Sequence, residues 1–191
     1  RVEALETKGF DKDLMFKRII SSGCGRGASF YSPADTESQK VDSSMKISPA
    51  DIFSLVNKFQ HGSEVYLATH GVHSAGLCDT RNILVFNEDI GRHNAVDKIF
   101  GKCLLEDIPT ADRAVITTGR ITSEILHKVA KRGIPILISI SEPTNLGIRI
   151  ADALNLTLVA SVRGKKMNVY TGGWRLESDE TYSSNLVKES V

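Results

Sequence analysis

The stretch RAVITTGRITSEILHKVAKRGIPILISIS, residues 113–141, decides the fold class. Its two apolar segments are AVITT and IPILISIS. They lack the apolar–polar alternation of a strand with one solvent-exposed face, and this absence is typical of strands covered on both faces. Between them, TSEILHKVAKRG has apolar residues at helical spacing and ends at Gly133. A strand, a helix and a second strand in this order predict a βαβ unit with parallel strands.

The same alternation continues on both sides of this unit. Ser48, Pro49 and Gly62 fit the N-cap, first turn and end of a helix in ISPADIFSLVNKFQHG. Further helices are expected within 92–107 and 144–155, and further strands within 64–71, 75–90 (two strands around DTRN), 156–164 and 167–172. We therefore predict an α/β fold, a three-layer α/β/α sandwich with a largely parallel sheet, over residues 47–174.

The remaining segments are predicted to be smaller parts. Residues 1–20 are expected to be the remnant of an N-terminal β region, 21–46 a flexible polar loop that carries Cys24, and 175–191 a polar C-terminal tail. The sequence begins with Arg1 rather than methionine, so we expect an N-terminal part to be missing.

Composition narrows the functional classes. The 191 residues are 41% hydrophobic and 25% charged with a net charge of +1, which gives no electrostatic case for binding nucleic acid or an acidic membrane. No run of 18 apolar residues suggests a membrane span. Three cysteines form too sparse a set for a disulfide framework and favour a reducing, cytoplasmic location.

The three cysteines have different sequence contexts. Cys103 belongs to an apolar helical stripe with Ala95, Val96, Ile99, Phe100 and Leu104, and is expected to be a small buried hydrophobe. Cys78 lies close to a turn and is also interpreted as structural. Cys24, in SSGCGRG among glycines and beside Arg26, has no packing rationale.

Four polar segments stand where a predicted strand meets the next element. They are THGVHSAG (69–76), NEDIGRHNAVDK (87–98), TTGRITSE (117–124) and SEPTN (141–145). Ligands of open α/β sheets bind at such places, beside helix N-termini. The sequence therefore predicts a ligand site where these segments converge.

Each motif also has a plainer interpretation. The two acids of EDIGRHN could cap a helix, although one acid is enough for a cap, so the added Arg92 and His93 favour a ligand site. TTGR suits a phosphate but lacks P-loop spacing. The basic residues of VRGKK form either a solvated turn or a clamp for an anion. His70, His73 and Cys78 suggest zinc, yet the H-x-E and P-C-x-x-C pattern of zinc deaminases is absent, and we expect no metal site.

Together, THGVHSAGLCD, EDIGRHNAVDKIFGKCLLED, TTGRITSEIL and ISEPTNLGIRIADALNLTLVASVRGKKMNVYTGG closely resemble the FdhD family of sulfur carriers needed for formate dehydrogenase activity. The resemblance implies a fold similar to the cytidine deaminases and a homodimer. It implies that a cysteine desulfurase supplies sulfur as a cysteine persulfide. The sulfur then passes to the molybdenum or tungsten of the bis-molybdopterin guanine dinucleotide cofactor, which is bound as cargo before it enters formate dehydrogenase.

The resemblance also implies the site residues. Cys24 corresponds to the persulfide cysteine of a C-x-x-C loop whose second position is Gly27 here, which leaves a single-cysteine carrier; Arg26 could lower the thiol pKa. SVRGKK corresponds to the cofactor-binding stretch, and EDIGRHN and TTGR are placed around the nucleotide. The predicted binding residues are Ser161, Val162, Arg163, Gly164, Lys165, Lys166, Glu88, Asp89, Gly91, Arg92, His93, Asn94, Thr118, Gly119 and Arg120.

Glu88 and Asp89 would repel phosphate, so we expect them to accept from a guanine N–H edge or to orient Arg92 and His93. Two other functions remain open. The chain could be a cofactor-binding chaperone without the transfer step, an alternative suggested by Gly27 in place of a second cysteine. It could also be a metal-dependent nucleotide hydrolase of the deaminase type.

Overall fold

The computed structural model describes residues 18–20, 28–30, 40–177 and 185–186, with the backbone alone for the first two segments and the last. The chain divides into two compact units, Arg1–Glu37 and Ser38–Val191. In the first, β1 (Arg18–Ile20) and β2 (Ala28–Phe30) pair as antiparallel strands, with Ile19 opposite Ser29. The sequence had placed residues 28–30 in a loop. Cys24, Arg26 and Gly27 lie outside the described residues.

The second unit is built on a seven-stranded sheet with the order β4-β3-β5-β6-β7-β8-β9. Its strands are β3 (His73–Cys78), β4 (Ile83–Asp89), β5 (Ala114–Thr117), β6 (Ile136–Ser139), β7 (Thr157–Arg163), β8 (Lys166–Thr171) and β9 (Asn185–Leu186). Strands β5, β6 and β7 are parallel, as the βαβ pattern predicted. However, β3 is antiparallel to both of its neighbours, and β8 is antiparallel to β7. The sheet is therefore mixed, and the prediction of a largely parallel sheet was wrong.

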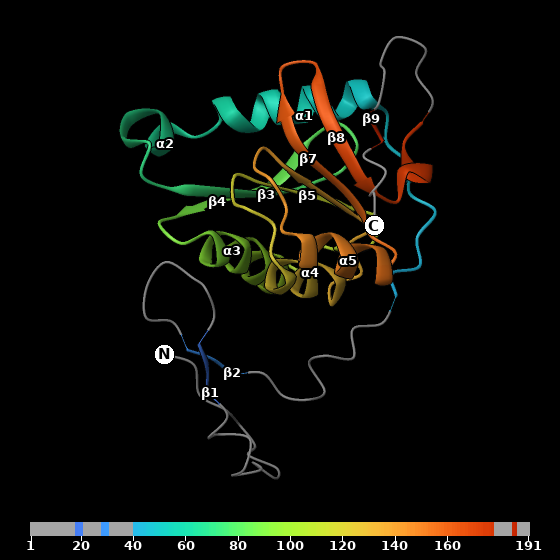
Figure 1. Ribbon diagram of the computed structural model, residues 1–191. Helices are drawn as coiled ribbons and strands as arrows, with labels where there is room; N and C mark the ends of the chain where they lie inside the picture. The colour runs from blue at the N-terminus through green and yellow to red at the C-terminus, as the bar shows by residue number, and fades with distance from the viewer. Residues whose placement is uncertain (1–17, 21–27, 31–39, 178–184, 187–191) are drawn as a thin grey trace. The chain divides into compact units, whose positions relative to one another are not determined.

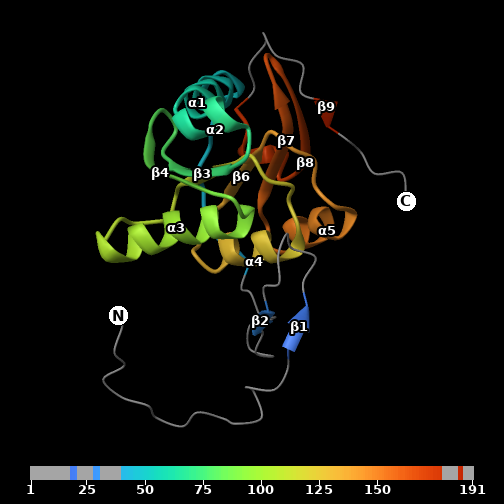
Figure 2. The same cartoon turned by 90° about the vertical axis from the view of Figure 1, so that its left-hand side faces the viewer.

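Helices cover both faces of this sheet. Helix α1 (Pro49–His61) packs on one face, while α3 (Arg92–Leu105), α4 (Ser123–Ala130) and α5 (Asn145–Ala153) pack on the other (Figures 1 and 2). The predicted caps of α1 are confirmed, because Ser48 Oγ accepts from the Asp51 N–H at 3.1 Å and Gly62 ends the helix. The result is the three-layer α/β/α arrangement expected from the sequence.

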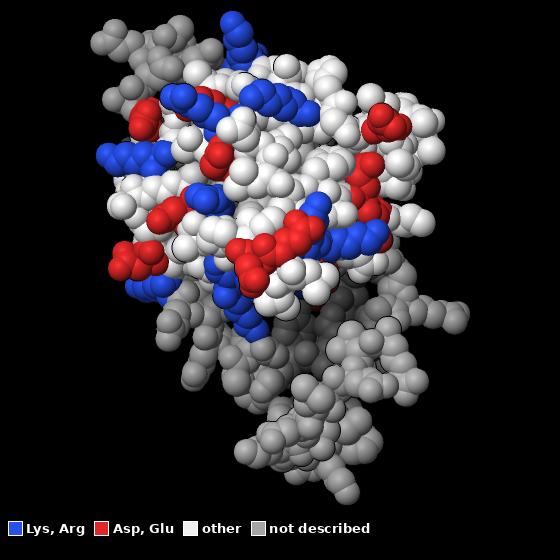
Figure 3. All heavy atoms as spheres, turned by 180° about the vertical axis from the view of Figure 1, so that it is seen from behind, with Lys and Arg blue, Asp and Glu red and all other residues white. Residues whose placement is uncertain are grey.

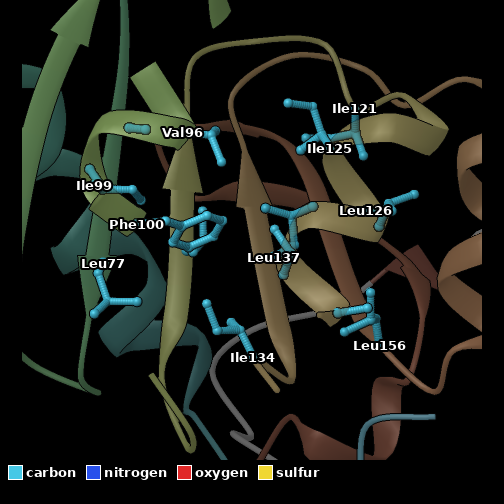
Figure 4. Packing of buried hydrophobic residues seen from close by; sticks show 14 of the residues in the cluster. Leu77, Val96, Ile99, Phe100, Ile121, Ile125, Leu126, Ile134, Leu137 and Leu156 are labelled. Carbon is cyan, nitrogen blue, oxygen red and sulfur yellow. The ribbon is translucent and has the colours of Figure 1, made fainter. Parts of the chain in front are cut away.

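The central strands divide their apolar side chains between two cores. On β5 and β6, Ile116 and Ile138 belong to the cluster under α1, whereas Val115 and Leu137 belong to the cluster under α3, α4 and α5. Figure 4 shows Leu137 beside Phe100 of α3 and Leu126 of α4. Burial on both faces explains why these strands read as continuous apolar runs.

Residues 64–69 correct a second expectation. The stretch EVYLAT was predicted to be a strand because it contains β-branched and aromatic residues, but it forms α2 (Glu64–Thr69). Ser63 caps this helix, its Oγ accepting from the Tyr66 N–H at 3.0 Å. None of the residues of α2 is buried. A local N-cap therefore outweighs β-propensity where no sheet neighbour is available.

The boundaries of the sheet unit extend beyond 47–174. Val41 is buried and its N–H donates to the carbonyl of Leu154 at 2.9 Å, so the end of the predicted loop 21–46 belongs to this unit. Arg175, placed in the predicted tail, is fully buried and donates from Nη1 to the Asn155 carbonyl at 2.8 Å. Arg175 Nε also donates to the carbonyl of Ser43 at 3.4 Å. Buried hydrogen bonds thus join both flanking segments to the fold.

Two cysteines are structural, as their contexts predicted. Cys78 and Cys103 are both buried. Burial raises the pKa of Cys78 to about 12 and also raises that of Cys103. Leu104 differs from the prediction: it is 67% exposed, because it lies one position beyond the stripe that ends at Cys103.

Candidate functional site

One edge of the sheet collects the four polar segments. Strands β4, β5, β6 and β7 run in the same direction, and their carboxyl ends carry Glu88, Thr117, Ser139 and Ser161. Segment 69–76 was expected to follow a strand, but it leads into β3. Because β3 is antiparallel, its first residue, His73, lies opposite Asp89 at the end of β4. The predicted convergence is therefore present, with the amino end of β3 contributing to it.

A row of hydrogen bonds crosses this edge from strand to strand. Ser74 Oγ donates to Glu88 Oε1 at 3.2 Å, and the Ser74 N–H donates to Thr118 Oγ1 at 3.0 Å. Ser141 Oγ then donates to the Thr118 carbonyl at 2.8 Å, and the Ser161 N–H donates to the Ser141 carbonyl at 3.4 Å. These side chains and backbone groups fix five strand ends relative to one another, a preorganised edge on which a polar ligand can bind.

His73 stands in this row beside Thr118 and is neutral at neutral pH. Its Nδ1 lies 3.1 Å from Thr118 Oγ1, which already accepts from Ser74 N–H, so the threonine hydroxyl can donate to Nδ1 and leave the proton on Nε2. Burial lowers the pKa of His73, and the nearby guanidinium groups of Arg92 and Arg120 lower it further. At neutral pH this edge therefore presents an imidazole N–H beside two cations, a set suited to an anion.

Lowering the pH from about 7.5 to about 5.5 is expected to reduce the free energy of unfolding. Burial lowers the pKa values of His73, His93 and His127 in the folded chain from 6.5. The unfolded chain therefore binds protons at a higher pH than the native state, and stability falls as the pH drops below 6.5. Urea unfolding at both pH values measures the loss, which should be smaller in His73→Gln. An equal loss in that variant would contradict the assignment to His73.

The motifs EDIGRH and TTGR pack directly against each other. Arg92, the first residue of α3, is buried, and its side chain crosses Gly119 so closely that a Cβ atom there would lie 2.7 Å from Arg92 Cβ. The next residue, His93, places Nε2 at 3.2 Å from Glu124 Oε2 in the first turn of α4. The amino-terminal turns of α3 and α4 are thus held together, and Arg92 is oriented by a glycine.

The two acids of EDIGRHN have internal partners. Glu88 Oε1 accepts from Ser63 and Ser74 hydroxyls. Asp89 Oδ1 accepts from Gly91 N–H at 2.9 Å and Asn94 Nδ2 at 3.0 Å, and Oδ2 pairs with Lys98 at 2.7 Å. These contacts lower the pKa of Asp89 to about 2, Lys98 being the largest cause. Asp89 therefore organises the β4–α3 turn, and Glu88 links the end of β4 to Ser63 and Ser74.

The predicted stretch Ser161–Lys166 divides between the edge and a projecting hairpin. Ser161 lies at the end of the polar row with φ of 56°, where the register of β7 against β8 shifts. Val162 is buried in the core, so its side chain faces away from solvent. Arg163, Gly164, Lys165 and Lys166 form the exposed turn between β7 and β8. Both views show this hairpin extending past α1 (Figures 1 and 2).

Charge and metal-ligating groups set limits on the site. On the face seen in Figure 3, Lys and Arg side chains are interspersed with Asp and Glu, in keeping with a net charge of +1. Within residues 40–177, His73 and Cys78 occupy opposite ends of β3, so they do not form the zinc set that was considered. The described residues contain no group of three His, Cys, Asp or Glu side chains placed to hold a metal ion.

Sequence reasoning missed several residues of the row. Ser74, Ser139, Ser141, Glu124 and Tyr170 were not among the predicted binding residues. Ser139 Oγ donates to the Gly119 carbonyl at 2.9 Å, and Tyr170 donates from its hydroxyl to Glu142 Oε2 at 2.7 Å. The segments THGVHSAG, TTGRITSE and SEPTN contained the signal for most of them, but Tyr170 comes from β8, and only the strand order brings it to this edge.

None of the helices in the described part of the chain has the length and apolar content to cross a bilayer.

Comparison with known proteins gives a consistent set of relatives. "Sulfur carrier protein FdhD" of Bacillus subtilis (strain 168) is 43% identical over 171 residues, covering 89% of this chain and 65% of that protein. The protein of the same name from Listeria innocua is 42% identical over 179 residues, covering 92% of this chain and 69% of its own length. The chain thus spans about two thirds of the length of these relatives.

A solved structure shares the fold. The crystal structure of a proposed formate dehydrogenase accessory protein from Desulfotalea psychrophila superposes with a TM-score of 0.70 at 36% identity, covering 76% of this chain and 63% of that one. The model of the FdhD/NarQ family matches residues 1–177, which include both Cys24 and the polar edge. On this evidence, the chain belongs to the FdhD/NarQ family.

Proposed function

We propose that this chain is a sulfur carrier that serves a formate dehydrogenase. The observation that carries the proposal is the family match over residues 1–177, joined to relatives named as sulfur carrier proteins. The thiolate of Cys24 attacks the outer sulfur of a persulfide on a cysteine desulfurase. A new S–S bond forms on Cys24, the S–S bond of the donor breaks, and the donor cysteine leaves as a thiolate.

The acceptor in this proposal is the molybdenum or tungsten of a bis-molybdopterin guanine dinucleotide, bound as cargo before delivery to formate dehydrogenase. The polar edge supports binding of such an anion: Arg92 and Arg120 lie near His73, and Arg163, Lys165 and Lys166 are on the β7–β8 turn. Backbone N–H groups at the starts of α3 and α4 add donors for phosphate oxygens. Discrete cations at an edge can bind pyrophosphate groups without a strongly basic surface.

The remaining details of the proposal follow from family membership. They comprise a homodimer, a cytoplasmic location and a fold related to the cytidine deaminases, with which the α/β/α layering agrees. The persulfide step requires a single thiol, so Gly27 in the second position of the C-x-x-C pattern is compatible with a one-cysteine carrier.

Loading with sulfur tests the proposed function. The chain is incubated with a cysteine desulfurase and cysteine, and its intact mass is measured before and after reduction. We expect the addition of one reducible sulfur, followed by its loss when the cofactor and an unsulfurated formate dehydrogenase are supplied, with a gain of formate oxidation. A chain that binds the cofactor but never gains sulfur is instead a chaperone, and this result would refute the carrier function.

A further inference from the structure

A nucleotide at the polar edge needs a partner for its base, and most carboxylates there are already engaged. Glu88 accepts from two serine hydroxyls, and Asp89 accepts from Gly91 and Asn94 while pairing with Lys98. Glu124 Oε2 lies 3.2 Å from Nε2 of His93. Glu88 and Asp89 thus bind groups on the β3, β4 and α3 side of the edge, which leaves the side formed by β6, β7 and β8 to be considered for the base.

Glu142 is an exposed acid on the loop after β6, at the same edge. Its Oε2 accepts from the Tyr170 hydroxyl of β8 at 2.7 Å. Hydrogen bonding to Ser161 is the largest cause of a lowered pKa at Glu142, followed by Tyr170, and Arg163 adds to the effect. The carboxylate is therefore ionised at neutral pH, and the Tyr170 hydroxyl of β8 donates a hydrogen bond to it.

The position of Glu142 joins the two parts of the predicted site. Its backbone carbonyl accepts from the Ile121 N–H at 3.3 Å, which ties it to the loop after TTGR. Its side chain lies by Ser161, the first residue of the SVRGKK stretch. A surface glutamate is usually free to change rotamer, whereas this one is hydrogen-bonded to Tyr170 on β8. Such preorganisation is costly at the surface and typical of a binding residue.

We propose that Glu142, oriented by Tyr170, is the specificity residue that accepts hydrogen bonds from the N1–H and N2–H donors of a guanine base. This inference rests on the proposed function, which supplies a guanine nucleotide as ligand. A carboxylate has two oxygens with about four acceptor positions, so Oε2 can keep the Tyr170 bond while both oxygens face the base. Adenine presents an acceptor at N1 and is rejected by the same carboxylate.

Calorimetric titration of the chain with GDP, IDP and ADP tests this assignment. Wild type should prefer GDP over ADP, with IDP between them because it lacks the N2 donors. In Glu142→Gln the affinity for GDP should fall about ten-fold or more, that for IDP less, and that for ADP not at all. Tyr170→Phe should lower GDP affinity by a smaller factor than Glu142→Gln does. Because Tyr170 positions the carboxylate, its loss should also bring the affinities for GDP and IDP closer together.

Two controls separate base recognition from charge and folding. Asp152→Asn removes an exposed carboxylate from α5 without touching the edge, and it should leave all three affinities unchanged. Circular dichroism checks that each variant is folded. The variant Glu142→Asp keeps a carboxylate on a shorter side chain, and it should retain part of the preference for GDP over ADP.

The outcomes distinguish this inference from the function on which it rests. Wild type that prefers GDP, with a preference that survives in Glu142→Gln, overturns the role of Glu142 and leaves the proposed cargo intact. Wild type that binds GDP and ADP equally, or binds neither, overturns both the role of Glu142 and the guanine nucleotide cargo.

Discussion

Replacing Cys24 with alanine is expected to abolish both sulfur loading by a cysteine desulfurase and sulfur transfer to the cofactor, with nucleotide binding unchanged. The thiolate is the nucleophile in persulfide exchange. Cys78 and Cys103 are buried, and burial raises the pKa values of both thiols, that of Cys78 to about 12. At neutral pH these two are protonated and inaccessible, so the proposed chemistry depends on Cys24.

Intact mass spectrometry after incubation with desulfurase and cysteine gives the readout. Wild type should gain one sulfur and Cys24→Ala none. Cys103→Ala serves as the matched control, since it also removes one thiol and should load like wild type. Sulfur found on the Cys24→Ala chain in the same amount as on wild type would assign the carrier role to another residue and refute the prediction.

The fold could be predicted from local sequence wherever local and global preferences agree. The βαβ unit at 113–141 has apolar strands, a helix of apolar periodicity between them and a glycine after it, and it forms β5, α4 and β6 as expected. Residues 64–69 failed because their β-propensity had no sheet neighbour to satisfy it, while Ser63 provided a helix cap. The antiparallel direction of β3 could not be predicted from the local sequence pattern either, because strand pairing depends on residues far apart in the chain.

The place of the candidate site could be predicted from the sequence, whereas the contacts within it could not. Four polar segments converge at one edge, as strand ends in α/β sheets do. Glu88 and Asp89 bind serine hydroxyls, a backbone N–H, Asn94 and Lys98, contacts that the sequence did not predict. Sequence spacing indicates which groups meet at an edge. It does not tell which of these groups bind one another, because side-chain contacts depend on the strand order and on the packing of distant segments.

Replacing Gly119 with alanine is expected to destabilise the fold and to weaken anion binding together. The added Cβ would lie 2.7 Å from Arg92 Cβ, closer than such atoms approach, and 3.1 Å from Arg92 Cδ, a tight contact. Gly119 cannot move away easily, because its N–H donates to Thr117 Oγ1 at 3.1 Å and its carbonyl accepts from Ser139 Oγ at 2.9 Å. Overpacking of this kind costs about 1–3 kcal/mol, measured as a loss in the free energy of unfolding in urea.

Gly101→Ala is the matched control for this change. Gly101 lies on α3, the helix that begins with Arg92, and a Cβ there would meet no atom within 4 Å. Alanine is a better helix former than glycine, so this variant should gain up to about 1 kcal/mol. The change in the free energy of unfolding is expected to have opposite signs for Gly119→Ala and Gly101→Ala. This difference separates the contact with Arg92 from any general effect of replacing glycine with alanine.

Displacement of Arg92 has a second consequence that a purely structural loss would not produce. Arg92 is the largest electrostatic contribution to the lowered pKa of His73, after burial. If the alanine at 119 pushes Arg92 away, the pKa of His73 should rise toward 6.5, which an NMR titration of the histidine ring measures. An unchanged His73 titration in a destabilised Gly119→Ala chain would show that Arg92 keeps its place. Gly119 would then serve packing alone, and the coupling between TTGR, EDIGRH and the β3 histidine would be disproved.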